Sequence, residues 1–247
     1  MSNDTIIFIL MTAVVAFMIG LAKGGLGGTL GALATPMMAL VMPPERVIGL
    51  LLPILMLADV FAVALHWGRW QRRMIVLLLP GSVAGVTIGT LFITNAPTEI
   101  IKIGLGIVVL LFAVYKILEK RILGALIYQS RDWHGLVAGT VAGFSSALAH
   151  TGGPPVSIYL LMQNVTPGMF VATSALFFMI LNWIKVPYYW YAHLFDLNAL
   201  LQILWLLPLV PLGVWLGKWA ADRIKKETFD SIIVVLLAVT ALLLIFG

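Results

Sequence analysis

The stretch that decides the fold is Ala22-Lys23-Gly24-Gly25-Leu26-Gly27-Gly28-Thr29, a glycine-rich break between two short apolar segments. A second break of the same kind, Ala149-His150-Thr151-Gly152-Gly153-Pro154-Pro155, lies in the other half of the chain. Glycine weakens a helix because it loses more backbone freedom than other residues on folding, and proline suits only the first helical turn. The two breaks therefore predict a pair of interrupted helical hairpins.

The composition around the breaks is that of an integral membrane protein. Of the 247 residues, 62% are hydrophobic and 10% are charged, and the mean hydropathy is +1.08. Ordinary soluble domains are roughly 45–50% apolar. Apolar runs close to the ~20 residues that a spanning helix needs fill nearly the whole sequence, without the alternation of a β-barrel strand. We therefore predict an all-α integral membrane protein in which protein or a water-filled cavity surrounds the broken hairpins.

The hydrophobic segments divide into two similar halves. We predict five in each half, at 5–22, 26–42, 47–67, 73–94 and 98–118, and then at 133–149, 153–165, 169–191, 198–220 and 228–246. Leu78-Leu79-Pro80, followed by Gly85 and Gly89, recurs as Leu206-Leu207-Pro208, followed by Gly213 and Gly217. This indicates an internal duplication. The expected units are a membrane repeat at 1–118, a cytoplasmic linker at 119–132 and a second membrane repeat at 133–247.

The basic residues predict how the chain crosses the membrane. If the segments alternate sides, one set of connections holds Lys23, Arg69, Arg72, Arg73, Lys116, Lys120, Arg121, Arg131, Lys218, Arg223, Lys225 and Lys226, and the other holds Arg46, Lys102 and Lys185. The positive-inside rule then puts both termini outside the cytoplasm. An odd number of crossings per half makes the repeats inverted. The first two segments either cross fully or form a re-entrant hairpin, which we favour.

Polar residues inside the segments mark the candidate site. Asp59 lies in the middle of 47–67, where an ionised carboxylate costs roughly 2.5–3.5 kcal/mol to insert. Its approximate counterpart in the second half is Asn182. We interpret the two as a coupling or gating pair, with Asp59 binding a proton or cation. A structural hydrogen-bonding role for Asp59 remains the alternative.

The breaks carry the groups that suit an anion. Lys23 attracts negative charge, and His150 donates a hydrogen bond or titrates near neutral pH. Backbone amides near helix starts favour anions as well, and the candidate residues for this are Gly27, Gly28, Thr29, Thr151, Gly152 and Gly153. The plainer alternatives are a lysine that reaches the membrane interface, a satisfied buried histidine, and glycines that only permit tight turns.

Two further segments carry glycine at every fourth position, Gly81, Gly85 and Gly89 in one and Gly135, Gly139 and Gly143 in the other. This spacing lets two helices approach closely, so we predict a packing role.

Several functions are disfavoured by the sequence. The lysine of the first break precedes its glycines, so the break is not a phosphate-binding Walker loop. Cysteine is absent and the four histidines lack metal-ligand spacing, so we expect neither a metal nor a cofactor. Ser145 and Ser146 lack a hydrolase elbow and an orienting acid, and the net charge of +5 lies mainly in short loops rather than in a nucleic-acid-binding stripe. We expect no enzymatic activity and no nucleic-acid partner.

The first break, its counterpart from Gly143-Phe144-Ser145 to Pro155, and the two similar halves resemble the TauE/SafE family of sulfite and organosulfonate exporters. The resemblance covers essentially the whole chain, although Leu26 interrupts the first glycine run and His150 precedes the second. It implies a carrier in the bacterial inner membrane that moves small sulfur-containing anions such as sulfite or sulfoacetate. Paired breaks in inverted repeats imply alternating access, with a proton or sodium ion as the coupling partner.

Two other functions stay open at this point. A passive anion channel would use the same pocket, and a non-transporting membrane accessory subunit would use the glycine packing faces. The sequence leaves the anion, the direction of transport and any assembly into a homo-oligomer undetermined.

Overall fold

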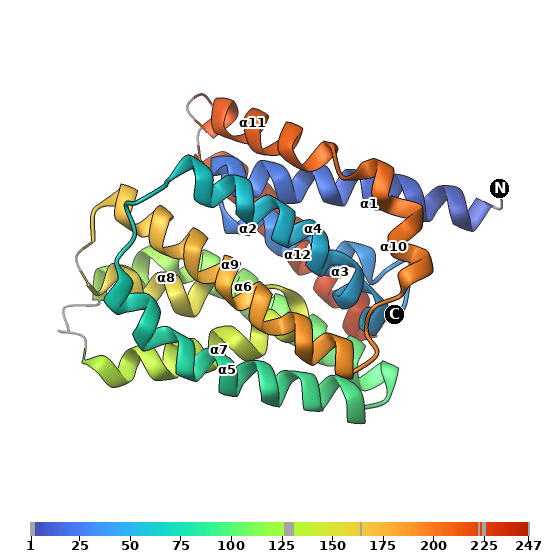
Figure 1. Cartoon of the computed structure of the whole chain (residues 1–247), viewed down its shortest axis with the longest axis horizontal. Helices are drawn as coiled ribbons and strands as arrows, with labels where there is room; N and C mark the ends of the chain where they lie inside the picture. Colours follow the sequence, from blue (N-terminus) through green and yellow to red (C-terminus); the bar gives the residue numbers. More distant parts are fainter. Residues whose placement is uncertain (1–2, 126–130, 164, 222, 224–225, 247) are drawn as a thin grey trace.

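The computed structural model describes residues 3–125, 131–163, 165–221, 223 and 226–246, and every regular element in these ranges is a helix (Figure 1). In chain order the elements are α1 Asn3–Leu21, the π-helical turn η1 Ala22–Leu26, α2 Gly28–Ala32, α3 Ala34–Met38, α4 Pro44–Leu65, α5 Arg72–Asn95, α6 Thr98–Ala125, α7 Asp132–Ala149, α8 Gly153–Leu161, α9 Pro167–Tyr191, α10 Leu197–Ile203, the 3-10 turn η2 Leu204–Leu206, α11 Leu209–Ala221 and α12 Lys226–Phe246. The predicted all-α fold class is confirmed.

The chain runs back and forth along one axis of the molecule. In Figure 1 both termini lie at the right-hand end, and α1 begins there, whereas α7 begins at the left-hand end. Ion pairing between Arg73 and Asp132 brings the starts of α5 and α7 to one end, and a hydrogen bond from Thr98 to Glu45 brings the starts of α6 and α4 to the other. This path suits oppositely oriented halves, and the inverted repeat remains a prediction.

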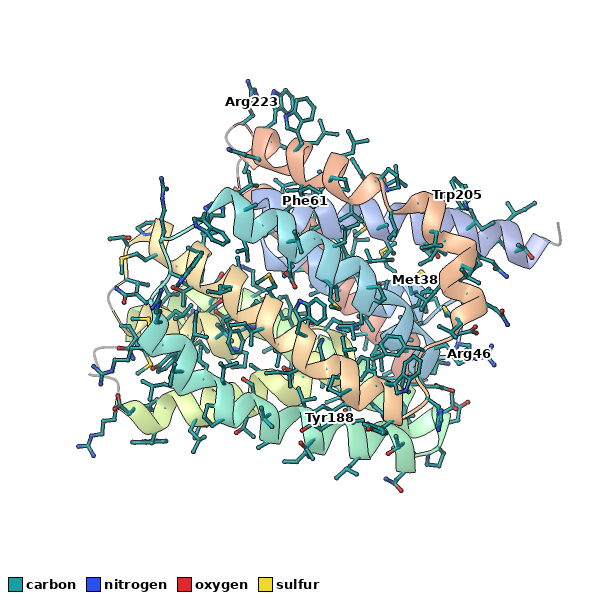
Figure 2. All side chains as sticks on the ribbon, viewed as in Figure 1. Met38, Arg46, Phe61, Tyr188, Trp205 and Arg223 are labelled. Atoms are coloured by element: carbon teal, nitrogen blue, oxygen red, sulfur yellow. The ribbon has the colours of Figure 1, made fainter. Side chains whose placement is uncertain are left out.

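Within the described residues, five helices are long and apolar enough to cross a membrane, and six if the bent pair 197–206 and 209–221 counts as one span. The short helices α2, α3 and α8 contain 5, 5 and 9 residues, well under the ~20 needed to cross alone. They return from the breaks beside α1 and α7. Large apolar side chains such as Phe61 and Trp205 point outward, as expected for a surface that faces lipid (Figure 2).

The glycines at every fourth position of α5 and α7 let these two helices pack closely along their lengths. A Cβ built on Gly85 would lie 2.1 Å from the Thr140 carbonyl oxygen of α7, and one on Gly139 would lie 2.1 Å from the Leu78 carbonyl oxygen of α5. The predicted packing role of these glycines is confirmed. Helices α1 and α11 meet in the same way, because Gly20 abuts Gly213.

The polar stretch between the halves begins within a helix. Helix α6 continues to Ala125, beyond the predicted boundary at 118, and α7 begins at Asp132. Residues 126–130 of the predicted linker, and Lys225 of the predicted basic loop, lie outside the described residues.

Candidate functional site

The first break is a local unwinding at the end of α1. The chain leaves α1 through the π turn η1, in which Gly25 has φ 147°, and then passes Gly27 at φ 96° before α2 begins. Both angles lie in a region that side chains with a Cβ rarely adopt, so glycine is required at these two positions. The turn leaves Lys23 inside the molecule, with 21% of its side chain exposed.

Lys23 forms an ion pair with Asp59 of α4, whose side chain is completely buried. The ammonium approaches Asp59 Oδ1 outside hydrogen-bonding geometry, so the contact is mainly electrostatic. The other carboxylate oxygen accepts a hydrogen bond of 2.6 Å from Asn182 Nδ2 of α9. The predicted Asp59 and Asn182 pair is therefore a direct contact. Lys23 is held by its ion pair with Asp59 and is not free toward the interface.

The second break follows α7 and turns at His150, whose backbone is left-handed with φ 54°. This conformation costs a non-glycine residue about 1–3 kcal/mol and persists only where the surroundings impose it. The imidazole supplies that restraint. Its Nε2 lies 3.0 Å from the Ile48 carbonyl oxygen of α4, and its Nδ1 lies 2.9 Å from Lys185 Nζ of α9. Both ring nitrogens of His150 are thus engaged with protein groups.

Lys185 is the functional candidate that the sequence analysis misplaced. The count of basic loop residues places Lys185 in a connection, although the predicted segment 169–191 contains it. In the structure it lies within α9 and its side chain is completely buried. Its Nζ donates to the carbonyl oxygen and the hydroxyl of Ser146, at 3.3 and 3.1 Å, in addition to His150. Its spacing is the signal that could have identified it. Lys185 follows Asn182 by three residues, which puts both on one helix face.

The two breaks converge on one aromatic ring. Lys23 Nζ lies 5.1 Å from the centroid of the Phe178 ring of α9, a cation–π contact. A Cβ built on Gly152 would lie 3.2 Å from the same ring. Phe178, Asn182 and Lys185 share one face of α9, and this face contacts both breaks. The sequence analysis did not single out Phe178, because a phenylalanine in an apolar segment is ordinary.

Open space adjoins some of the glycines in each break. A Cβ built on Gly27, Gly28 or Gly153 would meet no atom within 4 Å, and Gly28 is exposed. In contrast, Gly24 and Gly152 are tightly packed. Among the remaining predicted residues, Thr29 and Thr151 are buried, and the Thr151 hydroxyl donates a long hydrogen bond of 3.5 Å to the Ser145 carbonyl oxygen.

A cavity of about 420 Å³ lies elsewhere, between the start of α4 and the turn that leads into α10. Its lining residues include Glu45, Arg46, His193 and Asp196 and none from the breaks. Arg46 is labelled at that end of the molecule in Figure 2. Across the part of the chain that the structure describes, no group of three or more His, Cys, Asp or Glu side chains is arranged to hold a metal ion.

Comparison with known proteins adds the family. The family model described as Sulfite exporter TauE/SafE matches residues 12–244. The chain belongs to the sulfite exporter TauE/SafE family. The predicted resemblance is thereby confirmed, and the TauE/SafE match spans both breaks, Asp59, Asn182 and Lys185. Membership makes this chain a multi-pass membrane protein of a family of exporters of sulfur-containing anions, and transport rather than enzymatic activity is the family's function. Neither the curated proteins nor the solved structures contain a match.

Proposed function

We propose that this protein is a secondary active transporter that exports a small sulfur-containing anion, such as sulfite, sulfoacetate or another organosulfonate, by alternating access. TauE/SafE membership supports the class of cargo. The observation that carries the mechanism is the buried ion pair between Lys23 and Asp59, located at a break in the helix. The proposed setting is the bacterial inner membrane, with both termini outside the cytoplasm.

The ion pair gives a physical basis for proton coupling. A sulfonate or sulfite oxygen and the Asp59 carboxylate compete for the same ammonium group of Lys23. When Asp59 takes up a proton from solution, its negative charge is neutralised and Lys23 is released toward the anion. Asn182, which donates to Asp59, keeps the carboxyl group in place. A proton on Asp59 and an anion that engages Lys23 therefore bind together. A sodium ion beside Asp59 would produce the same release and is the alternative coupling ion.

The rest of the site is supplied by the two breaks. The open positions at Gly27, Gly28 and Gly153 give an oxyanion access to backbone amides. Thr29 and Thr151 add hydroxyl groups, and Gly152 places its backbone against Phe178. His150 would contribute directly only after its ring leaves Ile48 or Lys185, so in this conformation it positions the second break.

The test is transport by the full chain reconstituted into vesicles, with labelled sulfite or sulfoacetate and an imposed pH gradient. We expect saturable counterflow that is accelerated by the gradient. In Asp59→Asn, flux should lose its dependence on the gradient, because an amide binds no proton in this pH range. A gradient dependence equal to that of the wild type in correctly inserted Asp59→Asn would refute the coupling role.

The same preparation separates the competing functions. A passive channel would give large currents and no counterflow. An accessory subunit would move no anion and would copurify with a stable partner, and the mass of the purified complex would also reveal a homo-oligomer.

A further inference from the structure

Lys185 carries a buried charge that the coupling scheme above leaves unused. Four ion pairs join described residues, and Lys185 takes part in none of them. Its three hydrogen-bond partners are a carbonyl oxygen, a hydroxyl and an imidazole nitrogen, all of them uncharged. A completely buried ammonium with only neutral partners keeps an uncompensated desolvation cost, which a counter-ion would relieve.

The hydrogen bonds around His150 favour the charged form of this lysine. The Ile48 carbonyl oxygen can only accept, so His150 Nε2 carries the proton and donates to it. His150 Nδ1 then has a lone pair and accepts from Lys185 Nζ. With the two oxygens of Ser146, this gives three acceptors for the three N–H groups of an ammonium.

The charged and polar groups around Lys185 come from four packed elements. Turn η1 contributes Lys23, α4 contributes Asp59, α7 and its end contribute Ser146 and His150, and α9 contributes Asn182 and Lys185. With Asp59 ionised, Lys23 and Asp59 cancel and Lys185 leaves one unmatched positive charge. With Asp59 protonated, Lys23 and Lys185 leave two.

We propose that Lys185 is a second anion-binding cation, which exchanges one of its three protein acceptors for an oxygen of the anion, and that it sets the charge of the cargo, so that a dianion such as sulfoacetate is carried with one proton on Asp59. This inference rests on the proposed function. A dianion balances the two lysines when Asp59 is protonated, whereas a monoanion balances Lys185 alone while Asp59 stays ionised and paired with Lys23. A loaded site without net charge crosses an apolar interior at least cost.

A purely structural role for Lys185 is the competing explanation. Its ammonium donates to the Ser146 carbonyl oxygen near the carboxyl end of α7, where cations are favourable, and the Tyr189 hydroxyl donates to the Ala147 carbonyl oxygen beside it. This role requires a cation at position 185 for folding, but it predicts no effect of position 185 on the preference of transport for dianions over monoanions. The valence preference of transport therefore separates the two explanations.

The experiment compares sulfoacetate, a dianion, with methanesulfonate, a monoanion, in vesicles that contain the full chain. In Lys185→Gln we expect the ratio of sulfoacetate to methanesulfonate flux to fall about tenfold, as expected for loss of one charge-assisted hydrogen bond. Lys185→Arg should retain the wild-type ratio within about threefold, because it keeps the charge. Lys102→Gln, which removes a lysine near the start of α6, is the matched control. An unchanged ratio in inserted Lys185→Gln overturns the inference.

Proton counting on the wild type keeps the proposal testable if Lys185→Gln does not fold. We expect one proton to move with each sulfoacetate and none with methanesulfonate. Equal proton counts for the two anions would overturn the role of Lys185 while leaving the transport function intact. Absence of flux for every sulfur anion tested in the wild type would instead refute the proposed function.

Discussion

At the scale of single residues, the site depends on how buried charges are paired. Lys23 is attractive as an anion ligand from the sequence, yet its closest charged neighbour in the structure is a carboxylate of the same protein. The pair places a lysine inside the membrane without an unmatched charge. It also means that substitutions at position 23 affect stability as well as binding.

Lys23→Ala should lower both transport and stability. Removing one partner of a buried ion pair costs about 3–5 kcal/mol, and less here because Lys23 is partly exposed. The double variant Lys23→Ala/Asp59→Asn should recover most of the thermal stability, since it leaves no unpaired charge, but it should not recover transport. Thermal unfolding in detergent and vesicle flux measure the two effects. Full transport by the double variant would show that Lys23 does not bind the anion.

His66, at the end of α4 outside the membrane-spanning segments, predicts a pH effect on stability. Partial burial, followed by the positive charges of Arg69 and Lys218, lowers the pKa of His66 below the usual 6.5. The unfolded chain then binds a proton more readily than the folded one. Protonation of His66 therefore has no effect on the free energy of unfolding above pH about 6.5, and it lowers that free energy as the pH falls below this value.

His66→Gln should therefore unfold at the wild-type temperature at pH 8 and at a higher temperature than the wild type near pH 5.5. Unfolding monitored by tryptophan fluorescence over this range tests the sign. The variant also serves as a control for Asp59→Asn, because His66→Gln should retain the response of transport to an imposed pH gradient.

The sequence revealed the residues of the first break better than those of the second. Asp59 stood out because a carboxylate in the middle of an apolar segment has few explanations. Lys185 was missed because it was counted as a loop residue, although it lies six residues before the end of a 25-residue helix. The contacts of His150 with Ile48 and Lys185 join residues 102 and 35 positions apart, and no local pattern encodes them.

At the scale of helices and turns, glycine either permits close helix packing or leaves open space at a break. Replacing glycine by alanine at one position of each kind separates these two roles. Gly139→Ala should prevent stable folding, because its Cβ would lie 2.1 Å from a backbone oxygen of α5 that cannot move aside. Gly153→Ala should fold normally, since no atom lies within 4 Å of the added methyl group.

In the folded Gly153→Ala protein we expect a reduced affinity for the anion, because the methyl group occupies the space that an oxyanion needs to reach the amides. Size-exclusion profiles report folding, and the concentration dependence of flux reports affinity. Wild-type affinity in Gly153→Ala would mean that the open space beside α8 is not part of the site.

Helix positions were predictable because apolar run length nearly determines them in a membrane protein. The predicted segment 169–191 appears as α9 Pro167–Tyr191, and 133–149 appears as α7 Asp132–Ala149. The end of α6 was less predictable, since polar residues at the membrane surface continue a helix as readily as they end one. At the turn Ala22–Leu26, Lys23 pairs with Asp59 and Gly24 packs against Val214 of α11, and sequence spacing reveals neither contact.

At the scale of the whole molecule, the contact between α4 and α9 contains the buried pair of Asp59 and Asn182. On one side along these helices, Ala62, Val63 and Ala175 form a small apolar cluster, and on the other side Ile48 packs with Tyr189. An apolar cluster on each side of a polar site suits the alternating access proposed above, in which one cluster would open while the other stays closed.

A cross-link between α4 and α9 should stop transport if these clusters open in turn. Cysteine is absent from the native chain, so a pair introduced as Ala62→Cys/Ala175→Cys would be the only thiols present. Oxidation should join α4 to α9 and abolish flux, and reduction should restore it. The control pair Val86→Cys/Ala142→Cys lies within the cluster that joins α5 and α7, whose glycine-packed contact should stay closed throughout the cycle. Oxidation of the control should leave flux unchanged. Undiminished flux through the cross-linked α4–α9 pair would show that this contact does not open during transport.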